Sequence, residues 1–394
     1  MYPTLTAMLG DLLGIDIPLP IQTYGFFLAM GFVVAGLWLF YEMRRMERIG
    51  ILQGAKEKFV IGEAATFGEI LVNALVGFAV GYKGLAALVA WRAFCDNPQE
   101  FLISAKGSLL GGIVLAAIMA FWRYYEKEKQ RSPQPQIVEE TVYPHQRIGD
   151  LIMIAAVFGI LGSKIFTWIE DIDGFLRDPI GALFAFSGLT FYGGLIVAAI
   201  AVSLYARSKK IPFLHLLDIT APALIVAYGI GRLGCHFSGD GDWGIVNLAA
   251  KPLAFLPDWA WAYTYPNNVN NDGIPIPGCM GRYCSQLPEP VYPTSVYEFL
   301  MSTAIFCLLV VLRKKITHIP GLLFCIYLLF NGMERFCIET IRVNIQYPIL
   351  GTGIMLSQAQ IIALCLSLSG IIGTVILLLN KKKHPNANHT TMVN

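Results

Sequence analysis

Long apolar runs alternate with polar loops along the whole chain. Nine runs lie at about residues 20–41, 67–91, 107–124, 149–170, 189–206, 216–237, 296–312, 319–341 and 355–380. A helix that crosses a bilayer needs about 20 mostly apolar residues, and only helices or closed barrels satisfy their backbone hydrogen bonds in lipid. These runs are too long and too continuous for barrel strands. The pattern therefore predicts an all-α polytopic membrane protein with about nine transmembrane helices.

Clusters of basic residues follow every second apolar run, and basic residues are enriched in cytoplasmic loops. The pattern therefore predicts a chain whose N-terminus is outside and whose C-terminus is cytoplasmic. The longest outer loop, residues 239–292, would form a small extracytoplasmic head. The clusters are Arg44, Arg45, Arg48, Lys56 and Lys58; Arg123, Lys127, Lys129 and Arg131; Arg207, Lys209 and Lys210; Arg313, Lys314 and Lys315; and Lys381, Lys382 and Lys383.

The composition supports a membrane location and excludes some partners. The chain is 55% hydrophobic and 14% charged, whereas soluble domains carry about 25% charged residues. A net charge of +2, without a basic patch interleaved with aromatic residues, argues against nucleic-acid binding. The first 20 residues lack a basic segment and a cleavage site, so we expect the first helix to remain as an anchor.

An internal repeat indicates that one helix pair duplicates another. Gly68-Glu69 recurs as Gly149-Asp150, and Gly81 recurs as Gly162, both at an offset of 81 residues. The whole chain, 1–394, would form a single integral membrane domain in which 67–124 is an extra copy of 149–206. Chance similarity between Gly-rich spans is the alternative. Because Tyr192 has only an apolar counterpart in the first copy, we expect the second copy alone to carry chemistry.

Polar side chains inside the predicted spans indicate a site near the outer face. Charged residues within a membrane are costly and mark functional sites by default. Arg335, Glu339 and Arg342 share one helix face, and we expect Arg335 to pair with both Glu334 and Glu339. A helix-end ion-pair network with snorkelling arginines is the alternative. The groups that reach a similar depth are Tyr24, Tyr192, Arg232, Tyr297, Glu298, Arg335, Glu339 and Arg342.

The segment from Gly229 to Gly244 suits a phosphate ligand. Its glycines let a ligand approach the backbone, and the planar guanidinium of Arg232 matches phosphate. A Gly-rich packing interface between helices would explain the glycines but not Arg232 or the aspartates. Cys279 and Cys284 suit a local disulfide if their loop is extracytoplasmic. A metal pair is the alternative, but no nearby histidine completes a site, so we expect neither metal nor cofactor.

In order along the chain, these motifs resemble those of the bacterial prolipoprotein diacylglyceryl transferase family. They are Gln22-Thr-Tyr24-Gly25, Gly188-Leu-Thr-Phe-Tyr192-Gly193-Gly194, Gly231-Arg232-Leu-Gly234, Tyr292-Pro-Thr-Ser-Val-Tyr297-Glu298, Arg335-Phe-Cys-Ile-Glu339-Thr-Ile-Arg342 and Leu356-Ser-Gln-Ala-Gln360. The resemblance implies an inner-membrane enzyme that transfers diacylglyceryl from phosphatidylglycerol to the lipobox cysteine of a prelipoprotein signal peptide, releasing glycerol phosphate. Its partners would be these two substrates and membrane lipids.

The resemblance also implies roles for individual residues. Arg232 and Arg335 would hold the phosphate and stabilise its charge, with Tyr24 and Tyr192 completing the catalytic set. The substrate-binding residues would be Arg232, Arg335, Gly231, Gly234, Ser238, Asp240, Asp242, Tyr297, Glu298, Glu339 and Arg342.

Two departures from the family pattern affect the mechanism. The family commonly has histidine at Tyr192, and a phenol is a weak base at neutral pH, so Tyr192 would position substrate. Cys235 replaces an asparagine, and the acidic position after it could be Asp240 or Asp242. A lipid-binding or transport protein, or a catalytically impaired relative, are the alternative functions.

Overall fold

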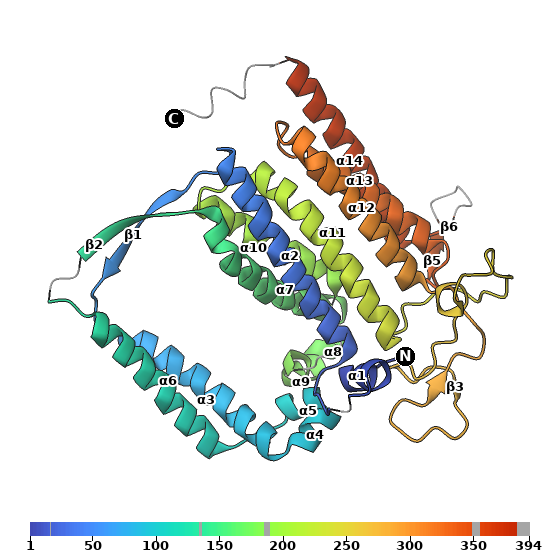
Figure 1. Ribbon diagram of the computed structural model, residues 1–394, viewed down its shortest axis with the longest axis horizontal. Coiled ribbons are helices and arrows are strands. Elements are labelled where there is room, and N and C mark those ends of the chain that lie inside the picture. The colour runs from blue at the N-terminus through green and yellow to red at the C-terminus, as the bar shows by residue number, and fades with distance from the viewer. Residues whose placement is uncertain (16, 134–135, 185–189, 349–354, 384–394) are drawn as a thin grey trace. The chain divides into compact units, whose positions relative to one another are not determined.

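The computed structural model describes residues 1–394 except 16, 134–135, 185–189, 349–354 and 384–394 (Figure 1). Among the described residues, every predicted run contains a long helix. The expected cytoplasmic C-terminus and Gly188, the first residue of the Tyr192 motif, lie outside the described residues. The helices are α2 (Thr23–Arg48), α3 (Phe67–Val89), α6 (Leu109–Gln130), α7 (Ile148–Glu170), α10 (Phe191–Ser208), α11 (Phe213–Ser238), α12 (Thr294–Ile316), α13 (Leu322–Glu339) and α14 (Gln358–Lys383).

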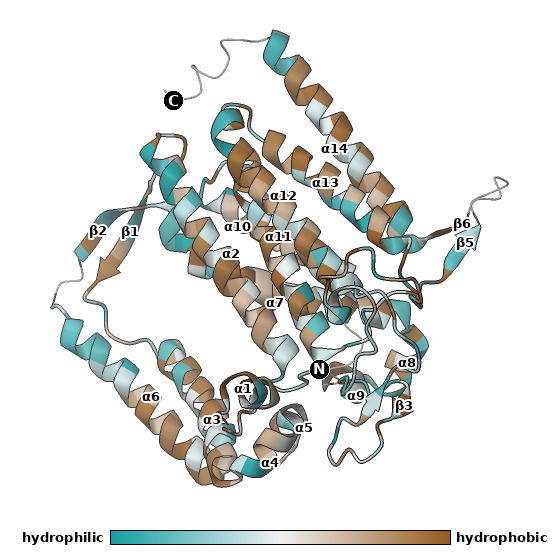
Figure 2. Ribbon diagram, turned by 45° about the vertical axis from the view of Figure 1, so that its right-hand side comes forward, coloured by the Kyte–Doolittle hydropathy of each residue, from teal (hydrophilic) through white to brown (hydrophobic). Residues whose placement is uncertain are grey.

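The lengths and hydropathy of these helices are those of a multi-pass membrane protein. Seven of them, α2, α3, α6, α7, α11, α12 and α14, are long and apolar enough to cross a membrane. Helices α10 and α13 each have 18 residues, and α13 carries Glu334, Arg335 and Glu339. Apolar residues cover most of each long helix, whereas hydrophilic residues gather at ends such as the C-terminal ends of α6 and α14 (Figure 2).

The contacts within the chain group it into two compact units. The first, residues 1–16, 22–52 and 206–394, contains α1 (Leu5–Leu13), α2 and α11 to α14. Helix α11 packs against α2, α12 and α13, and α13 packs against α14. A cluster of Ile225, Ile305, Leu309 and Leu323 fills the space between α11, α12 and α13.

A buried carboxylate fixes the start of α13. Asp218 on α11 accepts hydrogen bonds from the backbone N–H groups of Gly321 at 2.7 Å and Phe324 at 2.9 Å. These N–H groups at a helix start otherwise lack partners. Asp218 therefore ties α13, which carries two predicted site residues, to α11.

The head loop between α11 and α12 has little regular structure. It contains η2 (Asp258–Ala260) and the short antiparallel pair β3 (Ile274–Pro275) and β4 (Ser285–Gln286). Cys279 and Cys284 form the disulfide that was one of the two alternatives, with an S–S distance of 2.02 Å. A second short pair, β5 (Gln346–Pro348) and β6 (Met355–Ser357), lies between α13 and α14.

The second unit, residues 17–21 and 53–205, contains the two helix pairs of the repeat. Its strands β1 (Ala55–Ile61) and β2 (Gln136–Val142) form an antiparallel ribbon that the all-α prediction lacked. Its short helices are α4 (Trp91–Asp96), α5 (Pro98–Ile103), η1 (Pro144–Arg147), α8 (Ile172–Arg177) and α9 (Pro179–Phe184).

The helix boundaries of the second unit recur at a constant spacing. The bounds of α3, α4 and α5 recur in α7, α8 and α9 at an offset of 81 residues. A Cβ atom added to Gly81 would lie 2.1 Å from the carbonyl oxygen of Gly111, and one added to Gly162 would lie 2.5 Å from that of Gly193. Both pairs therefore cross at equivalent glycines, where the backbones approach too closely for a side chain.

Candidate functional site

Three arginines of the first unit converge on one buried carboxylate. Arg335 Nη1 donates to Glu298 Oε1 at 3.1 Å. Arg232 Nε lies 3.3 Å from Glu298 Oε2, and Arg342 Nη1 lies 3.5 Å from Glu298 Oε1. The Glu298 side chain is fully buried, at 0% exposure. We call this group the arginine–carboxylate cluster: Arg232 on α11, Glu298 on α12, Arg335 on α13, and Arg342, which follows the end of α13.

The turn after α11 brings a second carboxylate to this cluster. Gly239 ends α11 with a φ of 66°, and Gly241 has a φ of 97°, a region that favours glycine. This reversal returns Asp242 to Arg232, and the two oxygens of Asp242 accept from Arg232 and Arg342. The Thr294 hydroxyl donates to the backbone oxygen of Asp242 at 2.7 Å, which fastens the turn to α12.

Glu339 holds Arg335 from the other side, as the helix spacing predicts. Its Oε2 lies 3.2 Å from Arg335 Nη2, and its Oε1 accepts from Ser357 at 2.9 Å. The predicted pairing of Arg335 with Glu334 is wrong, since the described residues include no ion pair between them. Adjacent residues on a helix point in different directions, whereas residues four apart share a face.

The arginines keep part of their surface accessible despite these partners. The side chains of Arg232 and Arg335 are 18% and 25% exposed. Glu298 lies between them and offsets the repulsion of two nearby guanidinium groups. Glu298 already holds the two guanidinium groups close to each other. Their N–H groups that do not contact Glu298 can therefore bind an anion.

The structure distinguishes Asp242 from Asp240, the two candidates for the acidic position that follows Cys235. Burial opposes ionisation of Asp242, but Arg232 and Arg342 outweigh it and lower its pKa. Burial raises the pKa of Asp240, whose carboxylate accepts from the backbone N–H of Asp242 at 3.3 Å. Asp242 is therefore the partner of the arginines, and Asp240 shapes the turn.

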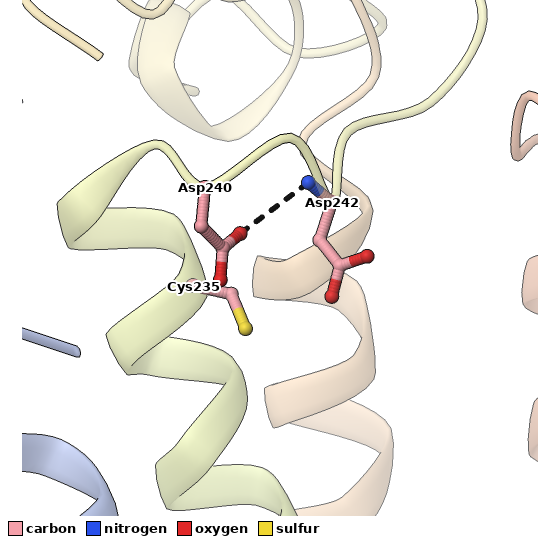
Figure 3. Close-up of side chains that lie close together, drawn as sticks. All are labelled: Cys235, Asp240 and Asp242. Carbon is pink, nitrogen blue, oxygen red and sulfur yellow. Dashed lines mark hydrogen bonds between the residues drawn. The ribbon is translucent and has the colours of Figure 1, made fainter. Parts of the chain in front are cut away.

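Cys235, Asp240 and Asp242 also lie close enough together to be considered as metal ligands (Figure 3). Both oxygens of Asp242, however, already accept from arginines. A cation there would face two guanidinium groups at short range, which is unfavourable. This geometry favours an arginine-bound carboxylate over a metal ligand.

Other predicted residues lie at the edges of the cluster. The Ser238 hydroxyl donates to the backbone of Gly234 at 2.8 Å, and the Tyr297 hydroxyl donates to Ala260 of the head at 3.1 Å. A Cβ on Gly234 would lie 2.9 Å from Phe27, whereas one on Gly231 would meet nothing within 4 Å. Gly234 therefore serves the packing of α11 against α2.

The two predicted tyrosines fall in different units. Tyr24 is 41% exposed, and its ring lies 3.4 Å from a Cβ built on Gly234, at the helix end that carries the cluster. Tyr192 is the second residue of α10 in the second unit, where it is half-buried. The first unit thus contains every predicted site residue except Tyr192.

Tyr228 is a member of the cluster that sequence reasoning missed. Its hydroxyl donates to Glu298 Oε1 at 2.9 Å, and the guanidinium of Arg232 lies 5.0 Å from its ring centroid. Its place in the sequence could have identified it, because Tyr228 precedes Arg232 by about one helical turn and therefore lies on the same face of α11.

Comparisons with known proteins agree with the resemblance of the motifs. The family model for prolipoprotein diacylglyceryl transferase matches residues 108–376. A phosphatidylglycerol–prolipoprotein diacylglyceryl transferase of Corynebacterium glutamicum is 29% identical over 59% of this chain and 68% of its own. Enzymes with the same name from Chlorobaculum tepidum and Methylococcus capsulatus are 29% and 27% identical, over 64% and 66% of this chain and 81% and 87% of their own.

Proposed function

Because the chain belongs to the prolipoprotein diacylglyceryl transferase family, we propose that its arginine–carboxylate cluster is the site of diacylglyceryl transfer. The substrates are phosphatidylglycerol and a prolipoprotein, as the relatives' names state. The acceptor is the thiol of a lipobox cysteine, and the products are a thioether-linked lipid and glycerol phosphate. This reaction is the first step of lipoprotein maturation.

One observation supports this site: Glu298 holds Arg232 and Arg335 in place while both arginine side chains stay partly exposed. A guanidinium offers two parallel N–H donors to a phosphate, and such charge-assisted hydrogen bonds are stronger than neutral ones. Glu298 fixes both Arg232 and Arg335 before substrate arrives. Interactions that are already in place cost no reorganisation when charge develops in the transition state.

The reaction displaces glycerol phosphate from the diacylglyceryl carbon. The thiol sulfur forms a bond to that carbon, and the bond between the carbon and the phosphate oxygen breaks. The sulfur loses its proton, and the departing phosphate oxygen takes up one, so atoms and charge balance. Arg232 and Arg335 bind the phosphate and stabilise the charge that collects on its oxygen atoms.

A purified-enzyme assay tests this function directly. The protein in detergent or vesicles, given phosphatidylglycerol and a lipobox peptide, should add one diacylglyceryl group to the cysteine, as mass spectrometry would show. A peptide with serine in place of the cysteine is the control. Phospholipid binding without transfer would instead identify an impaired, lipid-binding relative.

Tyr192 provides a separate prediction about this reaction. We expect Tyr192→Phe to lower the transfer rate by about tenfold or less, because one hydrogen bond is worth roughly 0.5–1.5 kcal/mol. A group that transfers a proton would contribute about 10²–10⁴-fold. Steady-state rates with the lipobox peptide would measure the difference. A loss above about a hundredfold would contradict the positioning role. The Tyr192→His variant, which carries the residue common in the family, should remain active if the site follows the family pattern.

The chain would span the bacterial inner membrane nine times, with its N-terminus and head outside. The basic clusters support this topology, and so does the Cys279–Cys284 disulfide, because disulfides persist in oxidising compartments. We expect reporter fusions after Lys129, Lys210 and Lys383 to read cytoplasmic and a fusion after Asn270 to read extracytoplasmic. A cytoplasmic signal at Asn270 would refute both the topology and an outward-facing site.

A further inference from the structure

A pocket of about 380 Å³ lies between α3 and α6, the first helix pair of the repeat (Figure 1). Charges of both signs and an aromatic ring line it. The lining residues used below are Gly68, Glu69 and Asn73 on α3 and Trp122, Arg123 and Glu126 on α6. A Cβ atom added to Gly68 would meet nothing within 4 Å, so space remains open beside this glycine. The volume is that of a site for a small polar group.

The charged side chains of this pocket leave one acceptor unused. Arg123 Nη1 lies 3.1 Å from Glu126 Oε2, and Arg123 Nη2 lies 3.4 Å from Glu69 Oε2. Glu69 Oε2 is buried, and among the described residues it accepts no hydrogen bond. A second cation, Lys127, lies 3.6 Å from the other oxygen of Glu69. Two cations and two carboxylates together match a zwitterion, and the unused oxygen calls for an N–H donor.

The pocket lies where the helix pair would meet the membrane surface. Helices α3 and α6 are both long and apolar enough to cross a membrane, and the pocket lies near the start of α3 and the end of α6. Trp122 is 70% exposed, and tryptophan is enriched at the level of lipid head groups. One helical turn deeper than Val72 and Trp122, the side chains of Val76 and Ile118 are exposed on the same faces. An apolar surface therefore continues from the pocket and suits an acyl chain.

The second copy of the repeat lacks most of this lining. The pair Gly111-Gly112 of α6 recurs 82 residues later, so equivalent positions can be compared. The equivalents of Asn73, Trp122 and Arg123 are Ile154, Leu204 and Tyr205. In the second copy a single hydrogen bond, from Tyr205 to Asp150, takes the place of the ion pairs. A helix pair of this kind thus packs without the indole and the amide, so their presence in the first copy points to a ligand.

We propose that this pocket binds the head group of a phospholipid that carries a primary ammonium, as phosphatidylethanolamine does. The ammonium donates to Glu69 and Glu126 and lies near the Trp122 ring, whose face attracts cations. The phosphate accepts from Arg123, which offers paired donors. Phosphatidylcholine has no N–H to donate, and phosphatidylglycerol has no ammonium, so both fit less well. The site belongs to the helix pair for which no catalytic residue is predicted, and it goes beyond the proposed transfer reaction.

The test is a lipid titration of the purified full-length protein, followed by native mass spectrometry. Phosphatidylethanolamine should bind about tenfold or more tightly than phosphatidylcholine with the same acyl chains, because charge-assisted hydrogen bonds are lost with the second lipid. Glu126→Gln should weaken phosphatidylethanolamine binding by about tenfold or more for the same reason. Glu128→Gln is the matched control, since Glu128 pairs with Arg131 at the same distance of 3.1 Å and the same spacing on α6. It should leave binding unchanged.

A second pair of variants tests the space rather than the charge. Gly68→Leu should block phosphatidylethanolamine binding by filling the pocket. Gly149→Leu makes the same change at the equivalent glycine of the second copy, where a Cβ atom also meets nothing within 4 Å, and it should not affect binding. Lipid bound elsewhere on the protein is common to all variants and cancels in these comparisons.

Three results would overturn the proposal. The first is equal binding of phosphatidylethanolamine and phosphatidylcholine. The second is equal loss of binding in Glu126→Gln and Glu128→Gln. The third is displacement of the lipid by soluble phosphoethanolamine at similar concentration, which would identify a soluble amine as the occupant instead of a lipid. Gel filtration shows whether each variant is folded, and Glu126→Gln decides the outcome if Gly68→Leu does not fold.

Discussion

Replacing Arg232 or Arg335 by lysine should reduce diacylglyceryl transfer by about a hundredfold or more, although the charge is kept. A lysine ammonium is a single point donor and cannot reproduce the paired hydrogen bonds of a guanidinium to both Glu298 and phosphate. One lost charge-assisted hydrogen bond costs roughly 1.5–3 kcal/mol, and a lost contact to the leaving phosphate adds to this. The measurement is kcat/KM with phosphatidylglycerol and a lipobox peptide.

Arg313 offers a matched control for these substitutions. Its side chain is 19% exposed, and it pairs with the buried Glu42 at 2.6 Å near the other end of α12. It also lies over the Trp38 ring, as Arg232 lies over Tyr228. Arg313→Lys should keep transfer within about tenfold of normal, because no substrate group is proposed there. Near-normal transfer by both Arg232→Lys and Arg335→Lys would show that these arginines are structural.

Glu298→Gln should nearly abolish transfer and destabilise the protein. Removing one partner of a buried ion pair costs about 3–5 kcal/mol, because the remaining charge is left uncompensated. Here three arginines would surround a neutral amide and keep only Asp242 and Glu339 as counter-charges, so the repulsion among their guanidinium groups would increase. Thermal unfolding in detergent and the transfer assay would measure the two effects.

An anion should partly rescue the stability of this variant. Phosphatidylglycerol should raise the melting temperature of Glu298→Gln more than that of the unmodified protein, because its phosphate can replace the missing carboxylate. Glu42→Gln is the control, since Glu42 is a buried carboxylate that binds two arginines near the other ends of α2 and α12. It should lose stability but show no greater stabilisation by lipid. Equal stabilisation of both variants would argue against phosphate binding at Glu298.

Much of the cluster could be predicted because helical periodicity is local. The spacing of Arg335 and Glu339 places them on one face of α13, where they do pair. The prediction that Arg342 shares this helix face is wrong, because α13 ends at Glu339 and Arg342 forms a β-bridge with Gly244, from which it still reaches Glu298. The same rule would have excluded the pairing of Arg335 with Glu334 and would have found Tyr228. Asp242 could not be chosen over Asp240, because their difference depends on how the glycine turn aims each side chain.

The sequence by itself determined the helical, membrane-embedded character of this protein, the pairing inside α13, and the family. These properties follow from hydrophobic run length, helical spacing and residue identity, which are all carried by neighbouring positions. Only the tertiary structure decided that Glu298 lies between the arginines, that Asp242 returns to them, and that Glu334 is left with no partner among the described residues. Those contacts join α11, α12 and α13, and which side chains meet is set by helix packing and by the turn at Gly239 and Gly241.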